Sequence, residues 1–189
     1  MKDKLAKIVS IITIAPVMAF PMLTFLYIFD KDVFREPVYY VIAVLSLTVF
    51  PVLAYPFQIM FPKLRKTRRD GQRKLAFIFA VVGYLAGLAV SYLLNAPRDD
   101  MMIMVSYAIS GSILALFNLC HIKASGHACG VGGPCVLCAY FLGGCGWLIL
   151  LLIPLIFWAR LHMKRHRFPE LIIGASISMI SACIVINVM

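Results

Sequence analysis

Charge is scarce in this chain. Only 14% of its 189 residues are Asp, Glu, Lys or Arg, only eight of them are acidic, and 62% of the residues are hydrophobic. A soluble domain is about a quarter charged and about half apolar. A water-soluble chain could not bury so much apolar surface. The composition therefore excludes an ordinary soluble domain and predicts an integral membrane protein that uses the bilayer as part of its solvent.

The chain also lacks internal repeats, linkers and low-complexity segments, so we expect one domain over residues 1–189. Its first residues include Lys2, Lys4 and Lys7, followed by an apolar run, as in a signal peptide. The run is longer than a signal core of ~7–15 residues, and no small-x-small cleavage site ends it. We therefore expect an uncleaved first transmembrane helix.

Long apolar runs separated by clusters of charge predict an all-α bundle of about seven transmembrane helices. The five longer runs approach or exceed the roughly 20 residues that a helix needs to cross a bilayer. Prolines inside several runs, Pro16 and Pro51 among them, indicate kinks that neighbouring helices tolerate. The expected spans are 7–29, 38–62, 75–95, 101–119, 128–143, 146–159 and 170–188.

The fifth and sixth of these spans are short and are separated only by a glycine-rich segment, 143–146. Glycine accepts backbone angles that other residues refuse, so this segment favours a tight helical hairpin. The alternative is one kinked span over 128–159, which would give six spans in all. Such a helix would be ~48 Å long and would exceed a hydrocarbon core of ~30 Å.

The basic residues gather on one face of the expected bundle. With seven spans, that face carries the N-terminus and the segments 63–74, 120–127 and 160–170, which together hold fifteen of the eighteen Lys and Arg residues. The positive-inside rule places this face in the cytoplasm. We therefore expect a multi-pass protein of the cell membrane whose candidate site faces the cytoplasm.

The cysteines do not indicate a disulfide framework, because all six lie in or beside apolar spans, where a free thiol behaves as a small hydrophobe. Cys135 and Cys138 could pair on one helix face, but no second pair has zinc-like spacing. His162 and His166 also share a face, without an acidic ligand cluster beside them. We expect no metal site and no cofactor.

Polar residues at membrane depth are costly, so they are the first candidates for function. An even number of spans separates the segments 63–74, 121–127 and 160–170, so all three return to one face and can form one site. They offer cations for a phosphate. A Ser-Gly pair at a helix start can direct N–H groups at an anion, and His127 and His166 can act as acid, base or nucleophile.

These segments resemble the three motifs of the type-2 phosphatidic acid phosphatase family over residues 66–170. The family pattern is Lys, six residues and Arg-Pro; then Pro-Ser-Gly-His; then Ser-Arg, five residues, His, three residues and Asp. The matching positions here are Lys66 and Arg73-Lys74, then Ala124-Ser125-Gly126-His127, then Ala159-Arg160, His166 and Glu170.

The resemblance implies a role for each matched residue. His166 would attack phosphorus and form a phosphohistidine, and Glu170 would orient its imidazole. His127 would protonate the leaving oxygen and later activate water. Fixed cations and hydrogen-bond donors would stabilise the transferring phosphoryl group without a metal ion. The phosphate-binding residues would be Lys66, Arg73, Ser125, Gly126 and Arg160.

The chain departs from the family pattern at four positions. Lys74 and Ala124 replace prolines, Ala159 replaces a serine, and Glu170 replaces an aspartate. No implied proton carrier or cation is lost. Glu170 has a second interpretation, because an acid in the first turn of a helix is favoured by the helix dipole.

The sequence thus predicts a membrane phosphatase acting on phosphatidate, phosphatidylglycerophosphate or a polyprenyl (di)phosphate. Its expected partners are this lipid phosphate and the surrounding membrane lipids, with no nucleic acid. One alternative is a catalytically diverged protein that binds or transports lipid phosphates. Another is a structural membrane protein whose basic face only binds anionic lipid.

Overall fold

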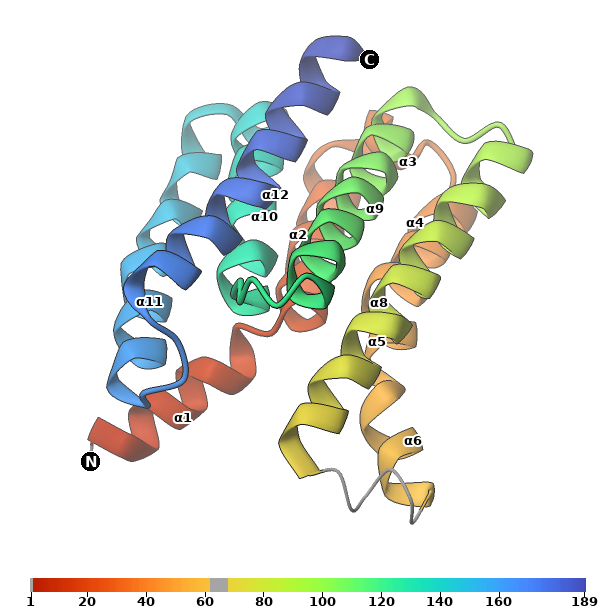
Figure 1. The fold of residues 1–189 in the computed structure, drawn as a ribbon. Coiled ribbons are helices and arrows are strands. Elements are labelled where there is room, and N and C mark those ends of the chain that lie inside the picture. Colours follow the sequence, from red (N-terminus) through yellow and green to blue (C-terminus); the bar gives the residue numbers. More distant parts are fainter. Residues whose placement is uncertain (1, 62–67) are drawn as a thin grey trace.

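The computed structural model describes residues 2–61 and 68–189, and within these residues it contains helices and no strands. The all-α bundle predicted from the sequence is confirmed (Figure 1). Five helical segments are long and apolar enough to cross a membrane, or six when a bent pair near the N-terminus is included. The chain is therefore built as a multi-pass membrane protein.

The first predicted span, 7–29, is broken into two helices, α1 (Lys2–Ile12) and α2 (Ala15–Phe29), whose axes differ by 59°. Ile14 has extended backbone angles between them, and Pro16 lies in the first turn of α2. Proline lacks an N–H and is favoured in the first turn of a helix, where that N–H has no partner within the helix, so Pro16 suits the start of α2. Because of this bend, α1 lies across one end of the bundle (Figure 1).

The second and third predicted spans, 38–62 and 75–95, correspond to helices on one side of the bundle (Figure 1). After α3 (Lys31–Phe34), the chain continues through α4 (Pro37–Val44), the π-helix η1 (Leu45–Val49), α5 (Phe50–Val52) and α6 (Ala54–Met60). Helix α8 (Arg68–Leu93) packs against η1. A Cβ on Gly87 would lie 2.4 Å from the Cβ of Ser46, so only glycine permits this approach.

Helix α10 (Gly126–Leu142) lies at the centre of the bundle, where it contacts α2, α9 (Arg98–Leu119) and α12 (Phe168–Val188). Glycines allow the close contacts: a Cβ on Gly130 would lie 2.5 Å from Ala15, and one on Gly132 would lie 2.7 Å from the Ser178 hydroxyl. The N-terminus of α10, which carries the Ser-Gly-His motif, is thereby held against its neighbours.

The apolar segment Gly126–His162 comprises α10, the 3₁₀-helix η2 (Gly143–Leu151) and α11 (Leu152–His162). Gly143 has a φ of 61°, and Gly146 packs directly against the backbone of Cys138, so the chain reverses at this point. Its two ends, His127 and Arg160, both contact Ser10, whereas a straight helix would separate them by ~50 Å. The segment is therefore a hairpin and not one kinked span.

The motif segments meet at one end of the bundle. The start of α8, the connection from α9 to α10 and the connection from α11 to α12 lie at this end, together with α1 (Figure 1). The C-terminus and the connection from α8 to α9 lie at the other end (Figure 1). The expectation that these segments share a face is confirmed for the described residues.

Candidate functional site

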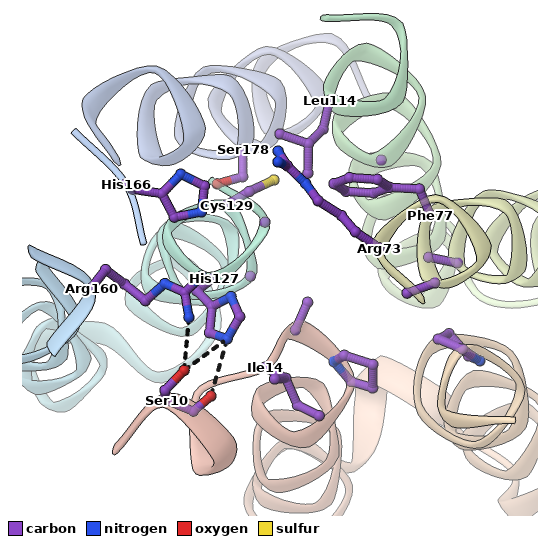
Figure 2. Close-up of a pocket in the computed structure, with 18 of the residues that line it drawn as sticks. Ser10, Ile14, Arg73, Phe77, Leu114, His127, Cys129, Arg160, His166 and Ser178 are labelled. Carbon is purple, nitrogen blue, oxygen red and sulfur yellow. Dashed lines mark hydrogen bonds between the residues drawn. The ribbon is translucent and has the colours of Figure 1, made fainter. Parts of the chain in front are cut away.

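A cavity of about 1260 Å³ opens among the three motif segments and extends between the helices. Seven Lys and Arg side chains line it among the described residues, against one acidic side chain, that of Glu170. Its walls also include aromatic and aliphatic side chains such as Phe77 and Leu114 (Figure 2). The cavity thus combines a cationic region with apolar walls. The lining cations are Lys7, Arg73, Lys123, Arg160, Lys164, Arg165 and Arg167.

His166 and Glu170 form a close pair at the start of α12. The Nδ1 of His166 lies 2.7 Å from the Oε2 of Glu170, and their side chains are only 7% and 18% exposed. An ionised carboxylate can only accept a hydrogen bond, so this contact holds the proton on Nδ1. The Nε2 of His166 is then the nitrogen with the available lone pair.

The charge state of His166 also follows from its surroundings. Burial lowers the pKa of His166 below the ordinary value of 6.5, and the nearby guanidinium groups of Arg160 and Arg73 lower it further. The hydrogen bond to Glu170 acts in the opposite direction. Because the net shift is downward, the imidazole is neutral at pH 7, which is the form that can act as a nucleophile.

His127 lies in the first turn of α10 and faces the same cavity. Its Nε2 lies 3.0 Å from the carbonyl oxygen of Ser10 and 3.4 Å from the Ser10 hydroxyl oxygen. A carbonyl only accepts, so Nε2 carries the proton and Nδ1 is the nitrogen that can bind a further proton. Figure 2 shows the rings of His127 and His166 on one side of the cavity and the side chain of Arg73 across from them.

Arg160 and Arg73 are held by hydrogen bonds to different parts of the chain. Arg160, in the last turn of α11, is 9% exposed, and its Nη1 donates to the hydroxyl of Ser10 over 2.8 Å. Arg73 in α8 donates to the side-chain oxygen of Asn118 and, over 3.2 Å, to the carbonyl of Ala124. A guanidinium has five N–H donors, so these two acceptors of Arg73 do not use all of its donors, and Arg160 lines the same cavity.

Ser125, the first residue of the Ser-Gly pair, has a mainly structural role. The hydroxyl of Ser125 is the N-cap of α10 and accepts from the N–H of Ala128 over 3.4 Å. Ser125 is fully buried and does not line the cavity, whereas Gly126 does. The N–H of Ser125 donates to the carbonyl of Glu170 over 2.9 Å, so the second and third motif segments are joined through the backbone.

Of the predicted site residues, the structure brings together Arg73, Gly126, His127, Arg160, His166 and Glu170 around one cavity. Lys66 lies outside the described residues. Glu170 fits both interpretations given from the sequence: it lies in the first turn of α12, and its side chain contacts His166.

Sequence reasoning missed Ser10 and Asn118. Ser10 shares the cavity-facing side of α1 with Lys7, three residues earlier, and this spacing was the available signal. No local pattern indicated that α1 would turn back against α10 and α11. Asn118, at the end of α9, accepts from Arg73, but a single Asn at a helix end is unremarkable in sequence.

His162 does not face this site. Its Nε2 lies 2.8 Å from a carboxylate oxygen of Asp3, and its ring stacks on Trp158. Among the described residues, no group of three or more His, Cys, Asp or Glu side chains could hold a metal ion. Cys135 and Cys138 are buried thiols in α10.

The comparisons with known proteins found no matching family model, no matching curated protein and no matching solved structure.

Proposed function

We propose that this chain is a membrane lipid phosphatase that hydrolyses the phosphomonoester or diphosphate of a lipid through a phosphohistidine on His166. The observation that supports this best is the pair of His166 and Glu170 in a cavity lined by seven cations. It presents a neutral imidazole, with its proton on Nδ1, to a region suited to a phosphate. The resemblance of the three segments to the type-2 phosphatidic acid phosphatase family is in keeping with this chemistry.

In the first step, the Nε2 lone pair of His166 attacks phosphorus, and the bond from phosphorus to the lipid oxygen breaks. The electron pair of that bond goes to the leaving oxygen, which takes a proton from the imidazolium form of His127. Arrival of the phosphate beside His127 favours this charged form, because an anion close by stabilises a cation. Glu170 stabilises the positive charge that develops on His166.

In the second step, His127, now neutral, removes a proton from water. The resulting hydroxide attacks the phosphohistidine, the bond from phosphorus to Nε2 breaks, and the electron pair returns to that nitrogen. Inorganic phosphate leaves, and both histidines regain their starting states. Arg73 and Arg160 stabilise the phosphoryl oxygens in both steps, since they line the cavity beside the two imidazoles.

A lipid substrate is favoured because the cationic region lies at one end of an apolar bundle, next to the bilayer. A lipid phosphate can place its headgroup in the cavity while its tail stays among apolar side chains. Phosphatidate, phosphatidylglycerophosphate and polyprenyl (di)phosphates all meet this requirement. The excess of Lys and Arg at this end favours a cytoplasmic site in the cell membrane.

A second candidate is a protein that binds or transports lipid phosphates without hydrolysing them. Two observations favour it. Ala124 and Ala159 occupy positions where the family pattern has Pro and Ser. Arg73 already donates hydrogen bonds to Asn118 and Ala124, so fewer of its N–H groups remain for a phosphate. This candidate predicts lipid-phosphate binding that survives the loss of the His166 imidazole.

The test is phosphate release by the purified protein in detergent, on a panel of lipid phosphates with EDTA present. We expect release by the wild type and its loss, by at least a thousandfold, in His166→Ala, because no other group in the scheme can form the phosphoenzyme. His162→Ala is the matched control: it also removes an imidazole, but one that faces Asp3 outside the cavity.

A phosphoenzyme should also be trapped from a radiolabelled substrate, with the acid lability and alkali stability of a phosphoramidate. Release that is equal in His166→Ala and wild type would refute the histidine mechanism. No release on any substrate, with lipid-phosphate binding retained in both proteins, would support the binding candidate instead.

A further inference from the structure

Helix α1 contributes to the cavity although it belongs to none of the three motif segments. The bend of 59° between α1 and α2 turns α1 across the end of the bundle. Ala6 and Val9 pack on Ala159 of α11, and this contact fixes the rotation of α1 about its axis. Lys7 and Ser10 consequently line the cavity.

Ser10 contacts two residues of the proposed mechanism at once. Its hydroxyl accepts from the Nη1 of Arg160 over 2.8 Å, and its carbonyl lies 3.0 Å from the Nε2 of His127 (Figure 2). Ser10 is separated from these residues by 150 and 117 positions along the chain. One residue therefore bridges the guanidinium of Arg160 and the imidazole of His127.

The position of Ala159 explains why this hydroxyl comes from another helix. Ala159 is fully buried against Ala6 and Val9. A serine at 159 would add an atom to this close contact between α1 and α11. With alanine there, α1 packs closely on α11, and Ser10 supplies a hydroxyl beside Arg160.

We propose that Ser10 is a positioning residue of this site: its hydroxyl holds Arg160 where the phosphoryl group binds, and its carbonyl keeps the proton of His127 on Nε2. The inference rests on the proposed function and extends it, because it makes α1 a required part of the site. Arginine loses much rotamer freedom when it is held in one place. A guanidinium already held by Ser10 loses less when phosphate binds, so binding is tighter.

Ser10→Ala removes the hydroxyl and leaves the carbonyl contact to His127. We expect the inhibition constant of inorganic phosphate and the KM for the lipid substrate to rise about tenfold, the size typical of losing a hydrogen bond to a charged group. A fall in kcat is also expected, because Arg160 stabilises the phosphoryl oxygens in both steps, so the inhibition constant of inorganic phosphate is the readout that reports binding alone. Thr13→Val is the matched control, because it removes a hydroxyl of the same region that bonds only to the carbonyl of Val9.

A second pair of variants separates the hydroxyl from the shape of the side chain. Ser10→Thr and Ser10→Val have nearly the same volume, and only the threonine keeps a hydroxyl. We expect Ser10→Thr to bind inorganic phosphate close to the wild-type level and Ser10→Val to resemble Ser10→Ala. This comparison remains informative if Ser10→Ala itself folds poorly.

A double-mutant cycle tests whether Ser10 acts through Arg160. In an Arg160→Ala background, Ser10→Ala should cause no further loss of phosphate binding. An undiminished loss in that background, or equal binding by Ser10→Val and Ser10→Thr, would overturn the inference and leave the proposed function standing. Wild-type protein that neither binds inorganic phosphate nor releases it from a lipid would overturn the proposed function together with the role of Ser10. The failure of the proposed function is therefore distinguishable from the failure of the Ser10 inference alone.

Discussion

Replacing Glu170 by Gln tests whether the carboxylate next to His166 is needed for its chemistry. The substitution keeps the size of the side chain and removes its negative charge. The Nδ1 of His166 lies 2.7 Å from Oε2, and both side chains are largely buried, so water does not readily replace the contact. A hydrogen bond of this kind to a charged group contributes roughly 1.5–3 kcal/mol.

That contribution grows in the transition state, because His166 becomes positively charged as it attacks phosphorus. Loss of the carboxylate should therefore slow formation of the phosphoenzyme by a factor of about 10–150, because each 1.36 kcal/mol of the lost contribution changes the rate about tenfold. The amide adds a second effect, since its NH₂ can donate to Nδ1 and move the ring proton to Nε2. That tautomer has no lone pair for the attack.

The pH dependence gives a second, independent readout. His166 must be neutral to attack, so the rate rises with pH through the pKa of His166, which burial holds below 6.5. The hydrogen bond to Glu170 raises this pKa. Glu170→Gln should therefore move the acidic limb of the pH–rate profile to lower pH, while the plateau of the rate falls.

The assay is single-turnover formation of the phosphoenzyme with a lipid phosphate analogue whose leaving group is weakly basic. Such a leaving group does not require protonation by His127, so His127 does not contribute to the acidic limb, and the comparison of variants on one substrate cancels the titration of the substrate phosphate. Glu170→Asp keeps the charge and serves as the control, with partial activity expected from the shorter side chain. An acidic limb that moves to higher pH in Glu170→Gln, or an unchanged plateau, would refute this account of the pair.

Two further predictions concern other parts of the molecule. His127→Gln should slow release from a lipid phosphate by a factor of about 10²–10⁴, the usual range for a general acid, and should slow phosphoenzyme formation much less with the weakly basic leaving group; equal losses on both substrates would contradict the acid role. Gly87→Ala places a Cβ 2.4 Å from Ser46 and should destabilise the bundle by roughly 1–3 kcal/mol. Gly144→Ala is its control, because a Cβ there meets no atom within 4 Å; thermal unfolding in detergent that is equal for the two variants would contradict the packing argument.

Much of the fold could be predicted from the sequence because bilayer crossing is a local property. Each stretch must be apolar over about 20 residues, whatever its neighbours are. The hairpin at 143–146 was also predictable, since the four residues there include three glycines, and a single helix over 128–159 would be ~48 Å long in a hydrocarbon core of ~30 Å. The shared end of the three motif segments follows from counting the crossings between them. The contact of His166 with Glu170 was expected from the resemblance to the family motif and not from helical spacing, because His166 lies before the helix that carries Glu170.

Other features were decided only by the tertiary structure. The break at Ile14 separates the predicted first span into α1 and α2, and no sequence rule states in which direction α1 then turns. Ser125 has the residue type of a phosphate ligand, but its burial beside α12 makes it the cap of α10. Ser10 is an ordinary residue of a short helix until packing brings it beside His127 and Arg160.

The physical difference between the two groups of features is the range of the interactions that determine them. Apolar length and glycine content act within a few residues of one another, so the sequence by itself determined most of the apolar spans and the hairpin. The place of Ser10 depends on how Ala6 and Val9 pack on Ala159, and such packing depends on side chains that are distant in sequence. Only the folded bundle decides which hydroxyl lies beside which arginine.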